Sequence, residues 1–519
     1  MQILMLSERP YPDHGGGAGK FAHLLAACLV RRGHVVHLLC YGPGGSSPYS
    51  MDGIQVHRVP FLPCEGIAPQ DIEYFAMDSL LAYIRANIPM ASIDLVHDTC
   101  GFLSFWFPLS QHLQRLYSVP VVTHFGLLQF QLALTVFGPY PYSRAFLAVE
   151  GSRYETPQCF AVRISDRIVC PSRADAEFVQ ALYCPPPGCV VALHNPVEMF
   201  DLSSESIAAT RNKLAKPGEW LIFFGGRTAS HEKNSRTVLS AIRRLRIKHP
   251  EARLVLATDD KEEVERYHRG LGEAVTSLGW IRDAKEMARI LAAVDAVVMP
   301  SLYESYGQMA AEAMSVGTPV VASPVGAMVE LIRNGENGFI LGMDSRQWDR
   351  EIEERLVTLL KDRDLCRRMG LQGRRTVEEK ISVDRVTAQM EKLYRELVEI
   401  PHSNHRFRPG LPVLSTEKRD LYLQTLMRLG KETARRVGED VLARWPVTGE
   451  QRCLKCSHHR IATDTRNLVR LQRARFWTWL PWRPSWSEAV QHAVASQCPL
   501  ALLQKEELRI RGSSSNSLS

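Results

Sequence analysis

Short apolar runs alternate with longer amphipathic segments along the first 400 residues of the chain. The apolar runs predict strands at residues 2–7, 34–40, 119–124, 220–224, 253–257, 275–278 and 296–299. The amphipathic segments predict helices over residues 21–31, 236–248, 284–293 and 383–398. Strands that alternate with helices indicate an α/β protein with parallel, doubly wound sheets.

The alternation occurs twice, which predicts two Rossmann-like domains. We expect the first domain at residues 1–197 and the second at residues 219–381, because serine, lysine, proline and glycine cluster in the linker between them. A helical segment occupies residues 382–400, and residues 401–519 form an extension that we expect to be mostly helical. With 519 residues, 45% of them hydrophobic, the chain is long enough for two sizeable cores.

Glu304 follows the apolar strand at residues 296–299 and precedes a helix. Ser305 and Gln308 have the spacing of a capping box, which predicts that this helix covers residues 306–316. The amide groups at the start of a helix have no partner within it and attract anions. The strand end should therefore bind an anionic group such as a diphosphate, through the amides of Tyr306, Gly307 and Gln308.

Glu312 follows Glu304 after seven intervening residues. It falls on the stripe of the helix that we expect to be buried, with Met309, Ala313 and Val316. A carboxylate in that position needs partners, because burial of an unpaired charge is costly. Neighbouring hydroxyls of a ribose could supply them.

Three more strand ends carry candidate ligand-binding residues. Gly16 and Gly17 follow the first strand, where glycine lets a phosphate or sugar approach the backbone; the alternative is a flexible turn. Arg227 and Lys233 follow the strand at residues 220–224 and could hold a diphosphate, or could be ordinary surface charges. His124 ends the strand at residues 119–124, at the edge where open α/β sheets bind ligands, although many such histidines only complete a core.

Together these motifs resemble the retaining nucleotide-sugar glycosyltransferases of family 4. That family has a Gly-Gly pair in its first loop, a Gly-Arg after the strand that opens its second domain, a lysine at the next helix and two glutamates in the Glu304–Glu312 arrangement. The resemblance covers about the first 400 residues. It departs at Asn234, where the family usually has glycine.

The resemblance implies the GT-B fold, in which two Rossmann-like domains face a cleft and a helix, here residues 383–398, crosses back onto the first domain. It implies that Glu304 and His124 orient the donor sugar, that Glu312 holds the ribose, and that Ile281 contacts the base through main-chain groups. Arg227, Lys233 and the amides of residues 306–308 would stabilise the diphosphate charge.

The implied reaction transfers a hexosyl or N-acetylhexosaminyl group, with retention, from a nucleotide diphosphate sugar to a hydroxyl of a small molecule or glycolipid. UDP is favoured by analogy with the family. We expect no cofactor and no metal requirement, because Asp362 and Asp364 lie in a charged helical segment rather than at a strand end. Residues 125–154 are rich in Phe, Tyr and Gln and should line the acceptor side. A nucleotide-sugar epimerase and a non-catalytic scaffold acting through the extension are the alternatives.

The extension at residues 401–519 differs in charge from the rest. It carries 20 basic and 10 acidic residues, whereas residues 1–400 carry 43 and 46. Four of the nine tryptophans lie between residues 477 and 486. This composition is typical of a segment that contacts a membrane surface or packs against protein. Binding to nucleic acid is the less favoured alternative. Scattered cysteines and the lack of a long apolar run predict a cytoplasmic protein that could associate with the membrane surface.

Overall fold

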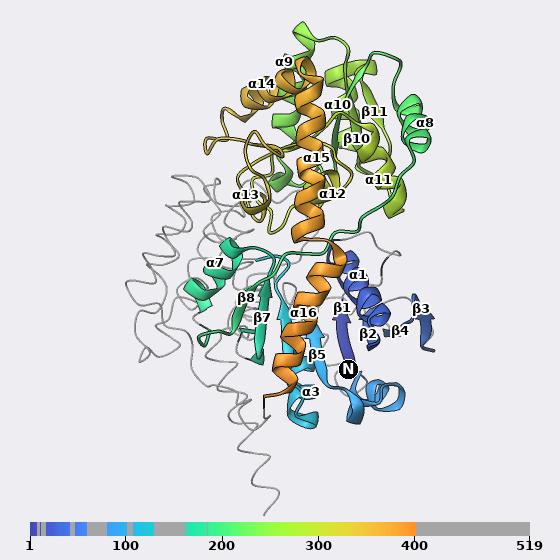
Figure 1. Ribbon diagram of the computed structural model, residues 1–519, viewed down its shortest axis with the longest axis vertical. Helices are drawn as coiled ribbons and strands as arrows, with labels where there is room; N and C mark the ends of the chain where they lie inside the picture. Colours follow the sequence, from blue (N-terminus) through green and yellow to red (C-terminus); the bar gives the residue numbers. More distant parts are fainter. Residues whose placement is uncertain are drawn as a thin grey trace, which may run out of the picture.

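The computed structural model describes residues 1–7, 11, 17–41, 47–59, 80–100, 107–128, 161–162, 164–183 and 185–400. Within this part of the chain, two parallel-sheet α/β domains are stacked along the long axis of the molecule (Figure 1). The prediction of two doubly wound domains is confirmed. Gly16, residues 129–154 of the expected acceptor segment and the extension at residues 401–519 lie outside the described residues.

The first domain is built on a sheet of eight strands in the order β3-β4-β2-β1-β5-β6-β7-β8. Its central strand β1 is buried on both faces, since Ile3, Leu4, Met5 and Leu6 are all inaccessible to solvent. Every strand pair is parallel except β3 with β4. The strands are β1 (Gln2–Ser7), β2 (Val35–Tyr41), β3 (Tyr49–Met51), β4 (Ile54–Val59), β5 (Leu95–Asp98), β6 (Val121–His124), β7 (Arg167–Cys170) and β8 (Val190–Ala192), and the helices α1 (Gly17–Arg31), α3 (Phe107–Tyr117) and α7 (Arg173–Tyr183).

The second domain contains a parallel sheet of six strands in the order β11-β10-β9-β12-β13-β14. Trp220, Ile222 and Phe224 face one layer of its core, while Leu221 and Phe223 face the other. The strands are β9 (Trp220–Gly225), β10 (Ala252–Ala257), β11 (Val275–Ser277), β12 (Ala296–Met299), β13 (Val320–Ala322) and β14 (Phe339–Ile340). The helices are α8 (Ser204–Leu214), α9 (Ser235–Lys248), α10 (Lys261–Leu271), α11 (Ala284–Ala293), α12 (Gln308–Ser315), α13 (Met328–Leu331), α14 (Trp348–Lys361) and α15 (Arg363–Lys380).

The chain passes between the domains twice, and the two passages pair with each other. The Val197 amide donates to the Ile381 carbonyl at 2.9 Å, and the Val383 amide donates to the Val197 carbonyl at 3.1 Å. Helix α15 runs along the second domain, and α16 (Val383–Val398) then continues along the first (Figure 1). Tyr394 on α16 is fully buried, and its hydroxyl lies 2.6 Å from Nδ1 of His97 on β5.

The start of α12 differs from the prediction. The helix begins at Gln308 rather than at residue 306, and the expected capping box does not form. The N-cap residue is Gly307 in the left-handed conformation, with a φ of 89°. Ser305 is buried, and its hydroxyl pairs with the phenol of Tyr303 at 2.9 Å instead of capping the helix. The left-handed turn at Gly307 directs the chain away from the geometry that a serine cap requires.

The buried stripe of α12 was also predicted in the wrong register. The helix buries Ala310, Ala311, Ala313 and Met314, whereas Met309 and Val316 are only partly buried. Small alanine side chains let α12 pack closely on its own domain. Met309 and Glu312 are thereby left on the side that faces the other domain.

Candidate functional site

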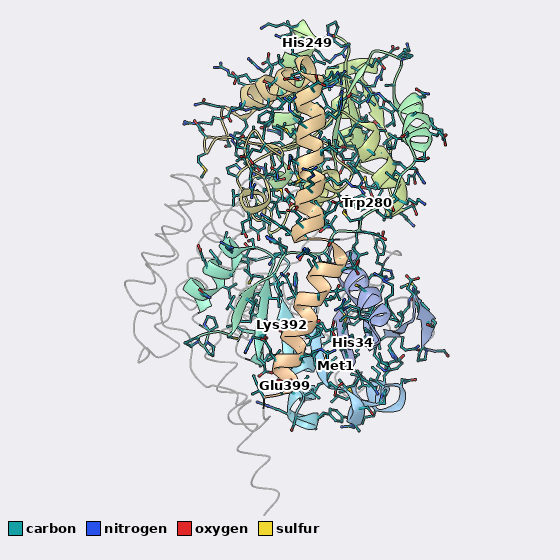
Figure 2. All side chains as sticks on the ribbon, viewed as in Figure 1. Met1, His34, His249, Trp280, Lys392 and Glu399 are labelled. Atoms are coloured by element: carbon teal, nitrogen blue, oxygen red, sulfur yellow. The ribbon has the colours of Figure 1, made fainter. Side chains whose placement is uncertain are left out.

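A cleft of about 680 Å³ lies between the domains, at the carboxyl ends of strands from both sheets. Figure 2 shows Trp280, one of the residues that line it, at the end of the second domain that faces the first. All the predicted site residues that the structure describes line this cleft: Gly17, His124, Arg227, Lys233, Ile281, Glu304, Tyr306, Gly307, Gln308 and Glu312. The structure thus brings together residues that are far apart in the sequence.

Glu304 is held by two side chains at the floor of the cleft. Its Oε1 accepts from the Lys233 ammonium, in a short ion pair, and from the Ser301 hydroxyl at 3.1 Å. The side chains of Lys233 and Glu304 are 20% and 15% exposed. Both groups therefore reach the cleft, but neither is freely solvated. Water screens their charges less than it would at an open surface, so they interact strongly with a group bound beside them.

Asn234 shows why glycine suits this position in similar sequences. It has a φ of 54° and a ψ of 43°, a left-handed conformation that glycine and asparagine adopt most readily. Its side-chain amide donates to the Pro300 carbonyl at 3.2 Å, and its side-chain oxygen accepts from the Thr237 hydroxyl at 2.9 Å. Asparagine thus adopts the left-handed conformation of the turn between Lys233 and α9. Its side chain also adds a hydrogen bond to Pro300, at the strand end that precedes Glu304.

The backbone amides of Tyr306, Gly307 and Gln308 lie at the start of α12, and all three residues line the cleft. Among the described residues, no backbone carbonyl accepts a hydrogen bond from the amides of Tyr306, Gly307 or Gln308. Glycine is favoured at position 307, because other residues rarely adopt its φ of 89°. The helix start therefore offers a compact set of donors beside Glu304 and Lys233, suited to an anion.

Glu312 lies four residues into α12 and has the partner that its partial burial requires. Its Oε1 accepts from the Lys20 ammonium at 2.5 Å and from the Gln308 side-chain amide at 3.3 Å. Lys20 belongs to α1 of the first domain, so this ion pair crosses the cleft. The side chains of Lys20 and Glu312 are each 15% exposed.

His124 lies at the carboxyl end of β6 and is almost completely buried. Its ring stacks on Phe21 with centroids 4.0 Å apart, and the side chain of Asn195, which also lines the cleft, interacts with the imidazole without a hydrogen bond of normal geometry. Burial lowers the pKa of His124 to about 3, so the imidazole is neutral at physiological pH. A neutral ring beside the cleft can donate to, or accept from, a hydroxyl of a bound sugar.

Arg227 and Ile281 lie at the rim. The Arg227 guanidinium is 71% exposed, and its Nη2 is 3.8 Å from Oε1 of the buried Glu232. Arg227 is therefore free to reorient toward a ligand, unlike Lys233. Ile281 lines the cleft together with Trp280 and Arg282.

Sequence reasoning missed Lys20, Tyr303 and the hydroxyl of Tyr306, a residue predicted only for its backbone amide. Lys20 follows the glycine-rich loop, and its place in the first turn of α1 was the available signal. Tyr303 and Tyr306 look like core aromatics, and both are buried. Their hydroxyls nevertheless bond across the domain boundary, to the backbone of Leu128 and to the Asn195 carbonyl.

Two features are absent from the described residues. They contain no group of three or more His, Cys, Asp or Glu side chains that could hold a metal ion. None of their helices is long and apolar enough to cross a membrane. Asp362 caps α15 by accepting from the Leu365 amide at 2.7 Å, and Asp364 pairs with Arg367 at 3.1 Å.

Family comparisons match both halves of the chain. Residues 15–199 match the model for "Glycosyltransferase Family 4", and residues 219–362 match the model for "Glycosyl transferases group 1". The chain belongs to the family 4 glycosyltransferases. A glycogen synthase of Mycobacterium tuberculosis is 27% identical over 362 residues, which cover 65% of this chain and 81% of the relative.

Solved structures show the same fold. Sucrose-phosphate synthase from Thermosynechococcus elongatus superposes with a TM-score of 0.64 at 19% identity, covering 76% of this chain and 99% of that one. HepE from Anabaena, solved in complex with UDP-glucose, superposes with a TM-score of 0.56 at 17% identity. The match covers 76% of this chain and 100% of HepE. This glycosyltransferase therefore has the GT-B fold.

Proposed function

We propose that this glycosyltransferase moves a hexosyl or N-acetylhexosaminyl group from a UDP-sugar to a hydroxyl of a small-molecule or glycolipid acceptor. The observation that carries the proposal is the grouping of Lys233, Glu304 and the free amides of α12 at one strand end. A cation and a helix start favour a diphosphate, while a carboxylate beside them favours sugar hydroxyls. The UDP-glucose bound by the structurally similar HepE supports uridine as the base.

Each residue has a distinct role in this proposal. Lys233, Arg227 and the α12 amides neutralise the charge that grows on the departing diphosphate. Glu304 and His124 orient the sugar, and Glu312 accepts hydrogen bonds from the ribose. Ile281 contacts the base through its main chain, and Gly17, with Gly16 beside it in sequence, lets the donor approach α1.

We propose retention of the anomeric configuration, by attack on the face from which the nucleotide leaves. A phosphate oxygen of the donor then takes the acceptor proton, so the protein needs no dedicated base. The engagement of Glu304 with Lys233 and Ser301 supports this assignment, because the carboxylate is already neutralised by a cation.

We also propose that turnover needs no divalent metal. Lys233, Arg227 and the α12 amides already provide positive potential where the diphosphate would bind. Activity should be retained in excess chelator, and a complete loss that magnesium or manganese restores would overturn this part.

The experiment is a transfer assay with UDP-, GDP- and ADP-sugars, followed by NMR of the product's anomeric proton. We expect transfer from a UDP-sugar to an added acceptor hydroxyl, with the configuration unchanged. Interconversion of free nucleotide sugars without a new glycosidic bond would indicate an epimerase. No consumption of any nucleotide sugar, with or without acceptor, would indicate a scaffold.

A further inference from the structure

Lys20 is the first domain's contribution to a cluster of charges in the cleft. Its ammonium lies 2.5 Å from Oε1 of Glu312 in the second domain. Burial opposes its charge, yet the pKa of Lys20 is raised because the Glu312 carboxylate is adjacent. Burial also raises the pKa of Glu198 in the linker, and the Lys20 ammonium opposes that rise. The Lys20 ammonium therefore interacts electrostatically with two carboxylates, Glu312 in the second domain and Glu198 in the linker.

The charges around the cleft balance when it is empty. Its described lining contains four basic side chains (Lys20, Arg227, Lys233 and Arg282) and four acidic ones (Glu232, Asp283, Glu304 and Glu312). Lys20 and Lys233 are each paired with a carboxylate. A diphosphate adds negative charge to this balance, and a cation that moves from its carboxylate to the diphosphate would help Arg227 to neutralise it.

Glu312 is the carboxylate that a donor would engage, because we assign it to the ribose. Hydroxyl groups that bond to Glu312 draw on the carboxylate charge that holds the Lys20 ammonium at Oε1, and so weaken that ion pair. The released ammonium is only 15% exposed, and it lies in the first turn of α1 beside Gly17, Ala18 and Gly19, which line the cleft. A buried cation at a helix start needs an anion within reach.

We propose that Lys20 changes partner when the donor binds, leaving Glu312 for the ribose and pairing with the diphosphate. This proposal rests on the proposed function, since it assumes a nucleotide diphosphate in the cleft. It makes Lys20 a donor-binding residue supplied by the domain opposite Lys233. The first domain would then respond to the diphosphate charge as well as to the acceptor.

Calorimetric titration with uridine, UMP and UDP tests the exchange. Lys20→Met should weaken UDP binding about tenfold to a hundredfold, as expected for loss of a charge-assisted contact. Uridine should bind the variant as well as the wild type or more tightly, because Glu312 is freed. Lys20→Arg should keep most of the UDP affinity. Lys285→Met, which removes an exposed lysine of α11, is the control and should bind all three ligands like the wild type.

Three outcomes overturn the exchange. Equal tightening for uridine and UDP in Lys20→Met would show that Lys20 only locks the empty cleft, and unchanged UDP affinity would show that it does not meet the diphosphate. Failure of the wild type to bind any nucleotide would overturn the proposed function itself. If Lys20→Met does not fold, a crystal structure of the wild type with UDP decides: we expect the Lys20 ammonium within salt-bridge distance of a phosphate oxygen, and a retained Lys20–Glu312 pair contradicts the proposal.

Discussion

The phenol oxygen of Tyr303 accepts a hydrogen bond from the backbone amide of Leu128 at 3.0 Å, across the domain boundary. Tyr303 immediately precedes Glu304, and Leu128 follows His124 by four residues. The two segments that we assign to the donor sugar are therefore joined by one buried hydroxyl. The Ser305 hydroxyl, 2.9 Å away, completes its hydrogen bonding.

Tyr303→Phe should reduce turnover more than nucleotide affinity. The change leaves the Leu128 amide without this acceptor, at a cost of about 1–3 kcal/mol, and loosens the segment that follows His124. Lys233 and the α12 amides remain in place to bind nucleotide. Steady-state kinetics and calorimetry measure the two effects separately.

Tyr267→Phe is the matched control for Tyr303→Phe. Tyr267 is equally buried, but its hydroxyl donates at 2.7 Å to the Ser235 carbonyl within the second domain. We expect a similar loss of stability with turnover retained. Wild-type turnover in Tyr303→Phe would contradict a role for the interdomain bond.

Tyr394→Phe should destabilise the docking of α16 on the first domain. The Tyr394 hydroxyl lies 2.6 Å from Nδ1 of His97, whose Nε2 has no hydrogen-bond partner among the described residues. Loss of the hydroxyl leaves His97 unpaired inside the protein, which should lower the free energy of unfolding by about 1–3 kcal/mol. Urea unfolding followed by circular dichroism measures the change.

Lys392 on the same helix provides the comparison for Tyr394 (Figure 2). Its side chain is 79% exposed, and its ammonium lies 3.9 Å from Oε1 of Glu396. Lys392→Ala should change stability by less than about 0.5 kcal/mol. Equal stabilities for Tyr394→Phe and the wild type would mean that the hydrogen bond to His97 contributes nothing.

The buried imidazole of His124 should make stability depend on pH. Burial lowers the folded-state pKa of His124 to about 3, whereas an unfolded histidine titrates near its model value of 6.5. The unfolded chain therefore binds the proton first, so the stability from neutral His124 is present above pH 6.5 and is lost as the pH falls toward 3. The slope should approach about 1.4 kcal/mol per pH unit below pH 6.

His124→Asn removes that slope and supplies the test. Asp98, whose pKa burial raises to about 7, titrates in both proteins, so its contribution cancels in the difference. Unfolding free energies measured between pH 7 and pH 5 should fall more steeply for the wild type than for the variant. Parallel curves would contradict the burial of a neutral imidazole.

Local patterns in the sequence placed the predicted strands and helices close to their observed positions, but they missed others, such as β4 (Ile54–Val59) and α14 (Trp348–Lys361). The boundaries of β12 (Ala296–Met299), α11 (Ala284–Ala293) and α16 (Val383–Val398) agree with the prediction, because each is set by neighbouring residues. The start of α12 was wrong because Gly307 adopts a left-handed turn. The preference of serine for helix caps could not reveal that the hydroxyl of Ser305 would meet a buried phenol.

The contacts between domains were not predictable in this way. Lys20 and Glu312 are 292 residues apart, and Tyr303 and Leu128 are 175 apart. Family resemblance pointed to Glu312 as a ribose ligand, but nothing local indicated its partner. Such pairs depend on how the domains are placed, which neither hydrophobic periodicity nor motif spacing encodes.

The binding of UDP to the wild type, Lys233→Met and Lys285→Met tests most directly whether the cleft is a nucleotide-sugar site. Lys233 pairs with Glu304 inside the cleft, whereas Lys285 is an exposed residue of α11 that does not line the cleft. We predict that calorimetry shows UDP binding to the wild type and to Lys285→Met with equal affinity, and binding about tenfold to a hundredfold weaker in Lys233→Met. Equal affinity in all three proteins, or no binding by the wild type, would contradict the assignment of the cleft.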